Sequence, residues 1–169
     1  MISNLVFADQ AEHGGYIGIP YKTLDCQGFV ERVLRDCGIK KDWRGSNHMW
    51  RDALSWKGTV KDAIEKYGDV PVGAWLFTVK DDGGEVERGY HDTEGNAAHV
   101  GIRLQNCAIH STTGGVQFCA FPAARWTHCG LCKYIDYTGK ADTRAEIGEK
   151  LDDIILAVNA IKNLLGVKL

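Results

Sequence analysis

One cysteine stands where backbone chemistry favours a reactive thiol. Cys26 follows Asp25 at the start of a segment with helical spacing. The unpaired N–H groups and the positive end of the macrodipole at a helix start favour a thiolate, so Cys26 is a candidate nucleophile. Most cysteines at helix starts are simply small buried apolar residues. A nucleophilic role therefore requires a nearby base.

Two histidines farther along the chain fall on one predicted hairpin. If Gln105-Asn106 forms a two-residue turn, residue 104 pairs with 107 and residue 101 pairs with 110. His99 then lies diagonal to His110 on one face, and the neighbouring aliphatic side chains face the other way. Such a pair suits a cysteine–histidine mechanism, in which His99 takes the thiol proton and His110 orients its ring. Two histidines on a solvated sheet face would give the same pattern.

Helices are predicted in the first half of the chain. Residues 25–37 have helical apolar spacing, with Asp25 as N-cap and a glycine as the stop. Two shorter helices follow, opened by Ser46 and Thr59, and Gly68 ends the second. We expect four side chains from this region in the core: Trp50, Leu54, Ile64 and Tyr67.

Short β-type segments follow Pro71 and are separated by Gly, Asn and Asp clusters. Residues 81–96 are rich in glycine and charge and predict an exposed hairpin or flap. Helices followed by strands favour an α+β fold, with the nucleophile helix packed on an antiparallel β-sheet. The predicted strands are Ala74–Val79, Ala97–Leu104, Ala108–Ser111, Val116–Phe121 and Leu131–Tyr137.

Composition narrows the possible partners. The 169 residues include 20 Lys plus Arg and 22 Asp plus Glu, and 44% of them are hydrophobic. This near-neutral balance, without a basic block, argues against nucleic acid or an anionic membrane as a partner. Residues 1–15 lack the pattern of a signal peptide, so we expect a chain made in the cytoplasm without a secretion address. We expect six reduced cysteines.

The remaining cysteines and histidines suggest no second site. Cys129 and Cys132 form a Cys-x-x-Cys pair preceded by His128, which allows a zinc-binding interaction module as an alternative. The other candidate thiols lie in apolar runs, so we expect two packed strand or turn cysteines, no metal and no cofactor. Four histidines are expected on the surface or in loops: His13, His48, His91 and His128.

The last segment has a different periodicity. Apolar residues recur at alternating spacings of four and three, which predicts an amphipathic helix over 141–169 beside a domain of residues 1–140. The helix could dock on its own domain, self-associate as a homo-oligomer, or attach to a phage tail assembly. The seam residues are Ile147, Leu151, Ile154, Val158, Ile161 and Leu165.

Three ordered motifs together resemble the NlpC/p-sixty family of papain-like cysteine peptidases, mostly bacterial and phage cell-wall hydrolases. The resemblance covers roughly residues 15–137 and implies a papain-like NlpC-type fold. The motifs are Pro20-Tyr21 with Asp25-Cys26-Gln27-Gly28-Phe29-Val30, then His99-Val100-Gly101-Ile102, then Ile109-His110-Ser111.

The resemblance implies roles for three residues in the chemistry. Cys26 would be the nucleophile, His99 the general base and then acid, and His110 the orienting third residue. Tyr21 matches the family tyrosine near the oxyanion site, where its hydroxyl and the Cys26 N–H would donate to the tetrahedral oxyanion.

The residues beside the nucleophile bear on capping and specificity. Asp25 is expected to cap the helix. Gln27 departs from the small serine usual in the family, and the stretch between Cys26 and His99 is longer than usual. Both departures lie near the expected substrate site, so they bear on specificity more than on chemistry.

The implied function is hydrolysis of an amide in peptidoglycan stem peptides, between γ-linked D-Glu and the diamino acid, through an acyl-enzyme on Cys26. A phage or prophage enzyme would reach the cell wall through a holin or on the virion. The alternatives are an amidase or acyltransferase with the same Cys/His machinery, and a phage assembly module with a vestigial site.

Overall fold

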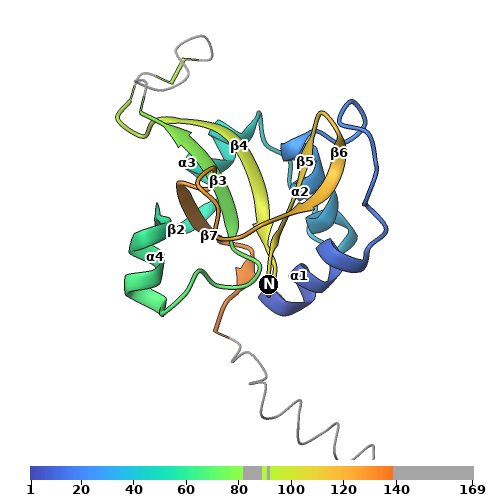
Figure 1. The fold of residues 1–169 in the computed structure, drawn as a ribbon, viewed down its shortest axis with the longest axis horizontal. Coiled ribbons are helices and arrows are strands. Elements are labelled where there is room, and N and C mark those ends of the chain that lie inside the picture. Colours follow the sequence, from blue (N-terminus) through green and yellow to red (C-terminus); the bar gives the residue numbers. More distant parts are fainter. Residues whose placement is uncertain (82–88, 91, 139–169) are drawn as a thin grey trace, which may run out of the picture. The chain divides into compact units, whose positions relative to one another are not determined.

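The fold is a mixed α+β domain in which helices flank an antiparallel sheet. A computed structural model describes residues 1–138, apart from 82–88 and 91 (Figure 1). The described residues form four helices: α1 (Asn4–His13), α2 (Cys26–Asp36), α3 (Ser46–Asp52) and α4 (Val60–Tyr67). They form eight strands: β1 (Ile2–Ser3), β2 (Leu54–Thr59), β3 (Trp75–Lys80), β4 (Asn96–Arg103), β5 (Ala108–Thr112), β6 (Gly115–Cys119), β7 (His128–Cys132) and β8 (Ile135–Asp136).

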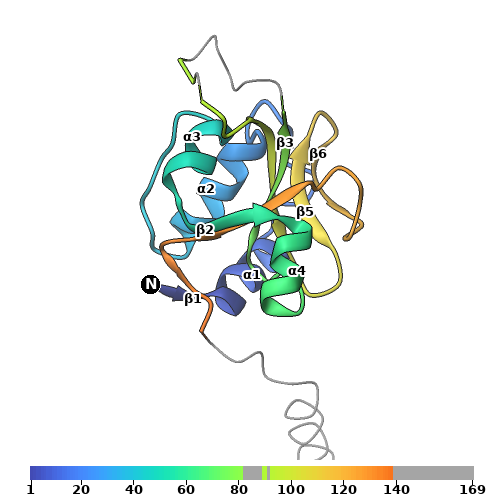
Figure 2. The same cartoon turned by 90° about the vertical axis from the view of Figure 1, so that its left-hand side faces the viewer.

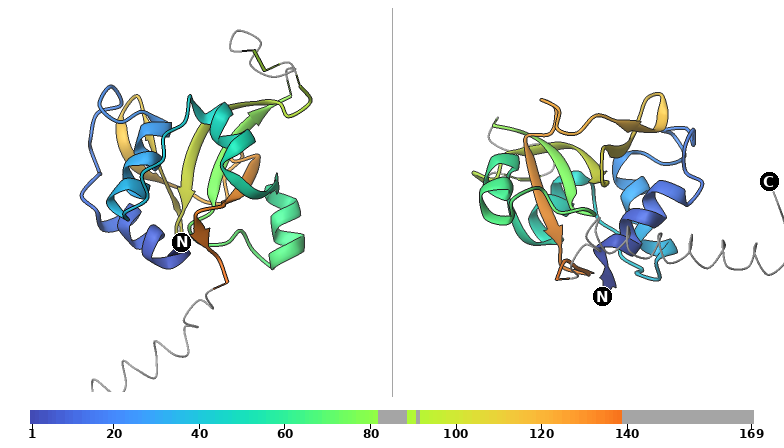
Figure 3. Two further views of the ribbon diagram at one scale, coloured as in Figure 1. Left: turned by 180° about the vertical axis from the view of Figure 1, so that it is seen from behind. Right: turned by 60° about the horizontal axis from the view of Figure 1, so that its bottom comes forward.

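Six strands build one antiparallel sheet in the order β2-β7-β3-β4-β5-β6, and β1 pairs in parallel with β8. Alternation along β3 assigns the two faces, because Trp75 and Phe77 belong to one buried cluster and Leu76 belongs to another. The first face is covered by α1, α2 and α3, and the second by α4 (Figures 2 and 3). The sequence prediction of an α+β class with an antiparallel sheet is confirmed.

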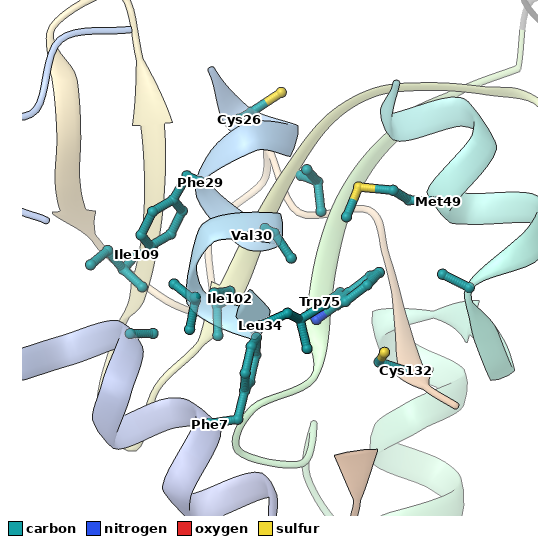
Figure 4. Packing of buried hydrophobic residues seen from close by; sticks show 14 of the residues in the cluster. Phe7, Cys26, Phe29, Val30, Leu34, Met49, Trp75, Ile102, Ile109 and Cys132 are labelled. Carbon is teal, nitrogen blue, oxygen red and sulfur yellow. The ribbon is translucent and has the colours of Figure 1, made fainter. Parts of the chain in front are cut away.

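The larger core holds α2 against the sheet. Phe29, Val30 and Leu34 of α2 are fully buried with Ile102 and Ile109 of β4 and β5 (Figure 4). This packing fixes the start of α2 beside the middle of the sheet.

Local signals place the helix starts as predicted. The Asp25 side chain accepts a hydrogen bond from Gly28 N at 2.6 Å and caps α2. Thr59 and Asp62 form a complete capping box at the start of α4, which ends at the left-handed Gly68. At the start of α3, the Ser46 hydroxyl does not cap the helix and instead donates to Ala97 O at 2.6 Å.

Several predictions for individual segments are wrong. Leu54 begins strand β2, and Ile64 and Tyr67 are 45% and 41% exposed, so of the four expected core residues only Trp50 is fully in the core. Helix α1 and strand β2 were not predicted. The expected strand Leu131–Tyr137 is divided between β7 and β8.

The Cys-x-x-Cys pair does not form a ligand set. Cys129 faces the cluster under α4, whereas Cys132 faces the cluster under α2, because residues three apart on a strand point to opposite faces. Burial raises the pKa of each thiol to about 12. They are packed strand cysteines, as expected. The predicted tail helix and half of the predicted flap lie outside the described residues.

Candidate active site

Cys26 is the first residue of α2, and its sulfur lies at the tip of the helix above the packed core side chains (Figure 4). The residue is 7% exposed. The Asp25 cap fixes the helix start, and a Cβ at Gly28 would lie 3.1 Å from the capping oxygen, so glycine suits this position. Asp25 therefore has the capping role that the sequence predicted.

The electrostatics of Cys26 differ from the simple helix-start expectation. Burial raises the pKa of the thiol, and the charge of Asp25 raises it further. Hydrogen bonds from the backbone N–H groups of Val100 and Gln27 and from the Tyr21 hydroxyl lower the pKa but do not offset the burial. The prediction of a thiolate is thus wrong for the resting protein, whose Cys26 is a neutral thiol at neutral pH.

Tyr21 reaches Cys26 from a loop that is tied to the sheet. Gly18 N donates to Val116 O at 2.9 Å, Val116 N donates to Ile19 O at 3.0 Å, and the Ser111 hydroxyl donates to Leu24 O. These bonds hold both ends of the loop on β5 and β6. The negative charge that Cys26 acquires when it ionises at alkaline pH, followed by burial, raises the pKa of Tyr21, so its hydroxyl stays protonated at neutral pH and can donate.

His99 and His110 form the pair that the hairpin register predicted. Ile102 pairs with Ile109 and Arg103 with Ala108, which is the expected register. His99 Nε2 lies 2.8 Å from His110 Nδ1. The His110 residue is 0% exposed, which excludes the alternative of a solvated sheet face.

The two imidazoles are packed against an indole and are neutral at rest. Trp126 stacks on the His99 ring at a centroid distance of 5.7 Å and meets the His110 ring edge-on at 5.4 Å. Burial, followed by the charge of Arg125, lowers the pKa of His99 to about 4. Burial, with the charges of His99 and Arg125, also lowers the pKa of His110 to about 4.

The Cys26 thiol and the His99 ring pack against different clusters of side chains. Cys26 packs in the α2 core and meets the Val100 N–H, while the His99 ring stacks on Trp126 of the other cluster. Within the described part of the chain, no hydrogen bond joins the Cys26 sulfur to His99. Apo enzymes often hold catalytic partners at longer distances than their complexes do.

Gln27 braces a loop. Its amide nitrogen donates both to Glu31 Oε1, at 2.7 Å, and to Trp43 O. Glu31 is 8% exposed and also accepts from Trp43 N at 2.6 Å, and burial raises the pKa of this carboxyl. With both amide protons used, the nitrogen of Gln27 is committed to the loop and not to a ligand.

A polar pocket of about 340 Å³ opens beside the thiol. Asn47 accepts from Ala97 N at 2.8 Å and donates to Asn96 Oδ1 at 2.8 Å, so α3 and the start of β4 form one rigid wall. The lining residues are Tyr21, Asp25, Cys26, Gln27, Gly45, Ser46, Asn47, Asn96, Ala97 and Ala98. All three residues expected near the oxyanion and substrate, Tyr21, Asp25 and Gln27, therefore border the pocket with Cys26.

Sequence reasoning missed Arg125 and the wall of α3. Nη1 of Arg125 lies 3.4 Å from His110 Nε2, and no local pattern signals that contact. Of the four histidines expected on the surface or in loops, His13 is exposed on α1, as expected, whereas His48 and His128 are half-buried in α3 and β7. His91 is outside the described residues.

The described residues bear on both metal binding and membrane spanning. No group of three or more His, Cys, Asp or Glu side chains there could hold a metal ion. None of the described helices combines the length and apolar character needed to cross a bilayer.

No family model matches the chain, and no curated protein is significantly similar to it. Membership of the NlpC/p-sixty family therefore stays a prediction.

Proposed function

We propose that this domain is a papain-like cysteine peptidase that hydrolyses an amide bond in peptidoglycan stem peptides. The observation that carries the proposal is the 2.8 Å contact between His99 Nε2 and His110 Nδ1. His99 lies on β4, and the backbone N–H of the next residue, Val100, donates to the Cys26 sulfur. The resemblance of the three motifs supplies the substrate class.

In the proposed reaction, the Cys26 sulfur attacks the amide carbonyl as its proton passes to His99 Nδ1. His110 accepts a hydrogen bond from His99 Nε2–H and so stabilises the imidazolium that forms. The Cys26 N–H and the Tyr21 hydroxyl donate to the oxyanion, and loss of one such donor costs about 2.7–4 kcal/mol of barrier. The protonated His99 then gives its proton to the leaving amine, and water hydrolyses the thioester.

This reaction starts from a neutral thiol and neutral imidazoles, because the pKa of Cys26 is raised and the pKa values of both histidines are lowered to about 4. Proton transfer therefore accompanies attack, as in general-base catalysis. The thiol and the His99 ring must also come together when substrate binds.

The test compares wild type, C26A and H99A on purified sacculi, with C37A as the matched cysteine control. Released amines and reducing sugars are measured separately. We expect wild type and C37A to release amines without sugars, and C26A and H99A to release neither. Amine release that survives in C26A would refute the proposal. Mass analysis of the products separates the endopeptidase, which creates a new D-Glu carboxyl terminus, from an amidase or acyltransferase.

A second candidate is a phage assembly module with a vestigial site. The raised pKa of Cys26 and the missing thiol–imidazole hydrogen bond favour it. Under this candidate, sacculi stay intact with every variant. The expected tail docking or self-association through residues 141–169 would then be the main activity, which sedimentation of the full chain against residues 1–140 would detect.

A further inference from the structure

Arg125 is an exposed cation beside the His99–His110 pair. It lies on the loop between β6 and β7, and its Nη1 is 3.4 Å from His110 Nε2. The backbone of Arg125 is fixed, because its carbonyl accepts from the Thr78 hydroxyl at 2.8 Å on β3. Any movement of the guanidinium would therefore leave the loop in place.

The direction of the hydrogen bonds follows from the chemistry of arginine. A guanidinium only donates, so His110 Nε2 must be the acceptor and the neutral His110 ring must carry its proton on Nδ1. That Nδ1–H donates to His99 Nε2, 2.8 Å away. The neutral His99 ring then carries its own proton on Nδ1, which is the nitrogen that would have to accept the thiol proton.

The charge of Arg125 acts in the same sense. Cys26 and Asp25 lie at the start of α2, β3 places the uncharged Thr78 opposite His99, and β6 places the uncharged Gln117 opposite His110. Arg125 is the cation that acts on both rings. Its positive charge opposes formation of an imidazolium at either ring.

We propose that Arg125 binds a substrate carboxylate, and that until it does so its hydrogen bond to His110 keeps His99 from accepting the Cys26 proton. This inference rests on the proposed function and adds to it an acyl substrate with a free carboxylate near the scissile amide. When the guanidinium leaves, His110 Nε2 takes a proton from water and the Nδ1 proton of His110 passes to His99 Nε2. The Nδ1 proton of His99 is released to water, so charge and protons balance. Arg125 is in this sense a positioning residue for the base.

The first test reads the tautomers directly. Long-range proton–nitrogen NMR of the ¹⁵N-labelled full chain carrying C26A, near neutral pH, should show the His99 proton on Nδ1. Adding R125M should move it to Nε2, and titration with glutarate should cause the same change in the Arg125 chain. The variant R125Q, which keeps a donor without the charge, should retain the Nδ1 proton and raise the pKa of both rings. The exposed lysine variant K61M is the matched control and should change nothing.

Two results would overturn the proposal that the Arg125–His110 hydrogen bond sets the tautomer of His99: a His99 proton already on Nε2 in the Arg125 chain, or one that stays on Nδ1 in R125M. A glutarate titration that leaves the tautomer unchanged would overturn carboxylate recognition. Neither readout requires peptidoglycan cleavage.

The second test uses turnover. Stem peptides with a free or an amidated D-glutamyl α-carboxylate are compared, and we expect R125M to lose about tenfold of the preference for the free acid, the factor that corresponds to about 1.4 kcal/mol. Equal preference in both proteins would overturn carboxylate recognition while leaving the peptidase assignment intact. If neither protein cleaves either peptide, the proposed function fails, and the NMR result still decides the role of Arg125.

Discussion

The buried histidine pair should make the protein less stable as the pH falls from 7.5 to 5.0. The pKa of His99 is about 4 in the folded protein, against an ordinary value of 6.5. Between these values the unfolded chain binds more protons than the folded one, so stability falls with pH. At pH 5.0, one such histidine lowers the free energy of unfolding by about 2 kcal/mol. His110, with a folded pKa of about 4, can add up to a similar amount.

The pH range from 7.5 to 5.0 separates the titration of the histidines from that of the carboxyl groups. Carboxyl groups with lowered pKa, such as Asp92 at about 2, lose their stabilising contribution mainly below their unfolded pKa of about 4. Urea unfolding at both pH values measures the difference for wild type, for the double variant H99Q/H110Q, and for H13Q as an exposed control. The double variant should lose most of the pH-dependent difference, the remainder coming from His128, whose pKa is also lowered by burial, and H13Q should keep the difference. Equal stability of wild type at both pH values would refute the assignment of two neutral buried imidazoles.

Three further changes have defined outcomes. G101A would place a Cβ 2.7 Å from the Trp126 ring and 3.1 Å from His110 Cβ. This crowding should lower the free energy of unfolding in urea by about 1–3 kcal/mol. G114A is the control and should not lower it, because a Cβ there meets nothing closer than 3.6 Å. Q27A removes two hydrogen bonds at the buried Glu31 loop and should cost about 1–3 kcal/mol by the same measurement, with Q27E as the size-matched comparison. Alkylation of the folded protein, mapped by mass spectrometry, should leave Cys129 and Cys132 unmodified at neutral pH because burial raises the pKa of each thiol to about 12; rapid labelling of either residue would contradict their placement in β7.

The predictions from sequence succeeded where neighbours along the chain decide the structure. The Asp25 cap involves residues three apart, and the His99–His110 register depends on a two-residue turn. Alternation then fixes which side chains share a face. These local rules were enough to bring the two imidazoles together.

The predictions failed where distant segments decide the structure. Strand β2 exists through pairing with β7, whose paired residues lie 69 to 78 positions further along the chain, and the residues of β2 alternate only weakly. Burial sets the pKa of Cys26 against the helix-start expectation, because the surrounding core comes from several elements. Arg125 reaches His110 through the loop that Thr78 holds, and no pattern near Arg125 in the sequence indicates this.

The β5–β6 hairpin has a mechanical consequence for the site. It carries His110, and through Ser111 and Val116 it also grips the two ends of the loop that presents Tyr21. Any tilt of this hairpin would therefore move Tyr21 and His110 together, whereas Cys26 is packed with helix α2. Small movements of the hairpin would then change mainly the distance from Tyr21 and His110 to the Cys26 sulfur. A bound peptide that shortens this distance would bring the three side chains together.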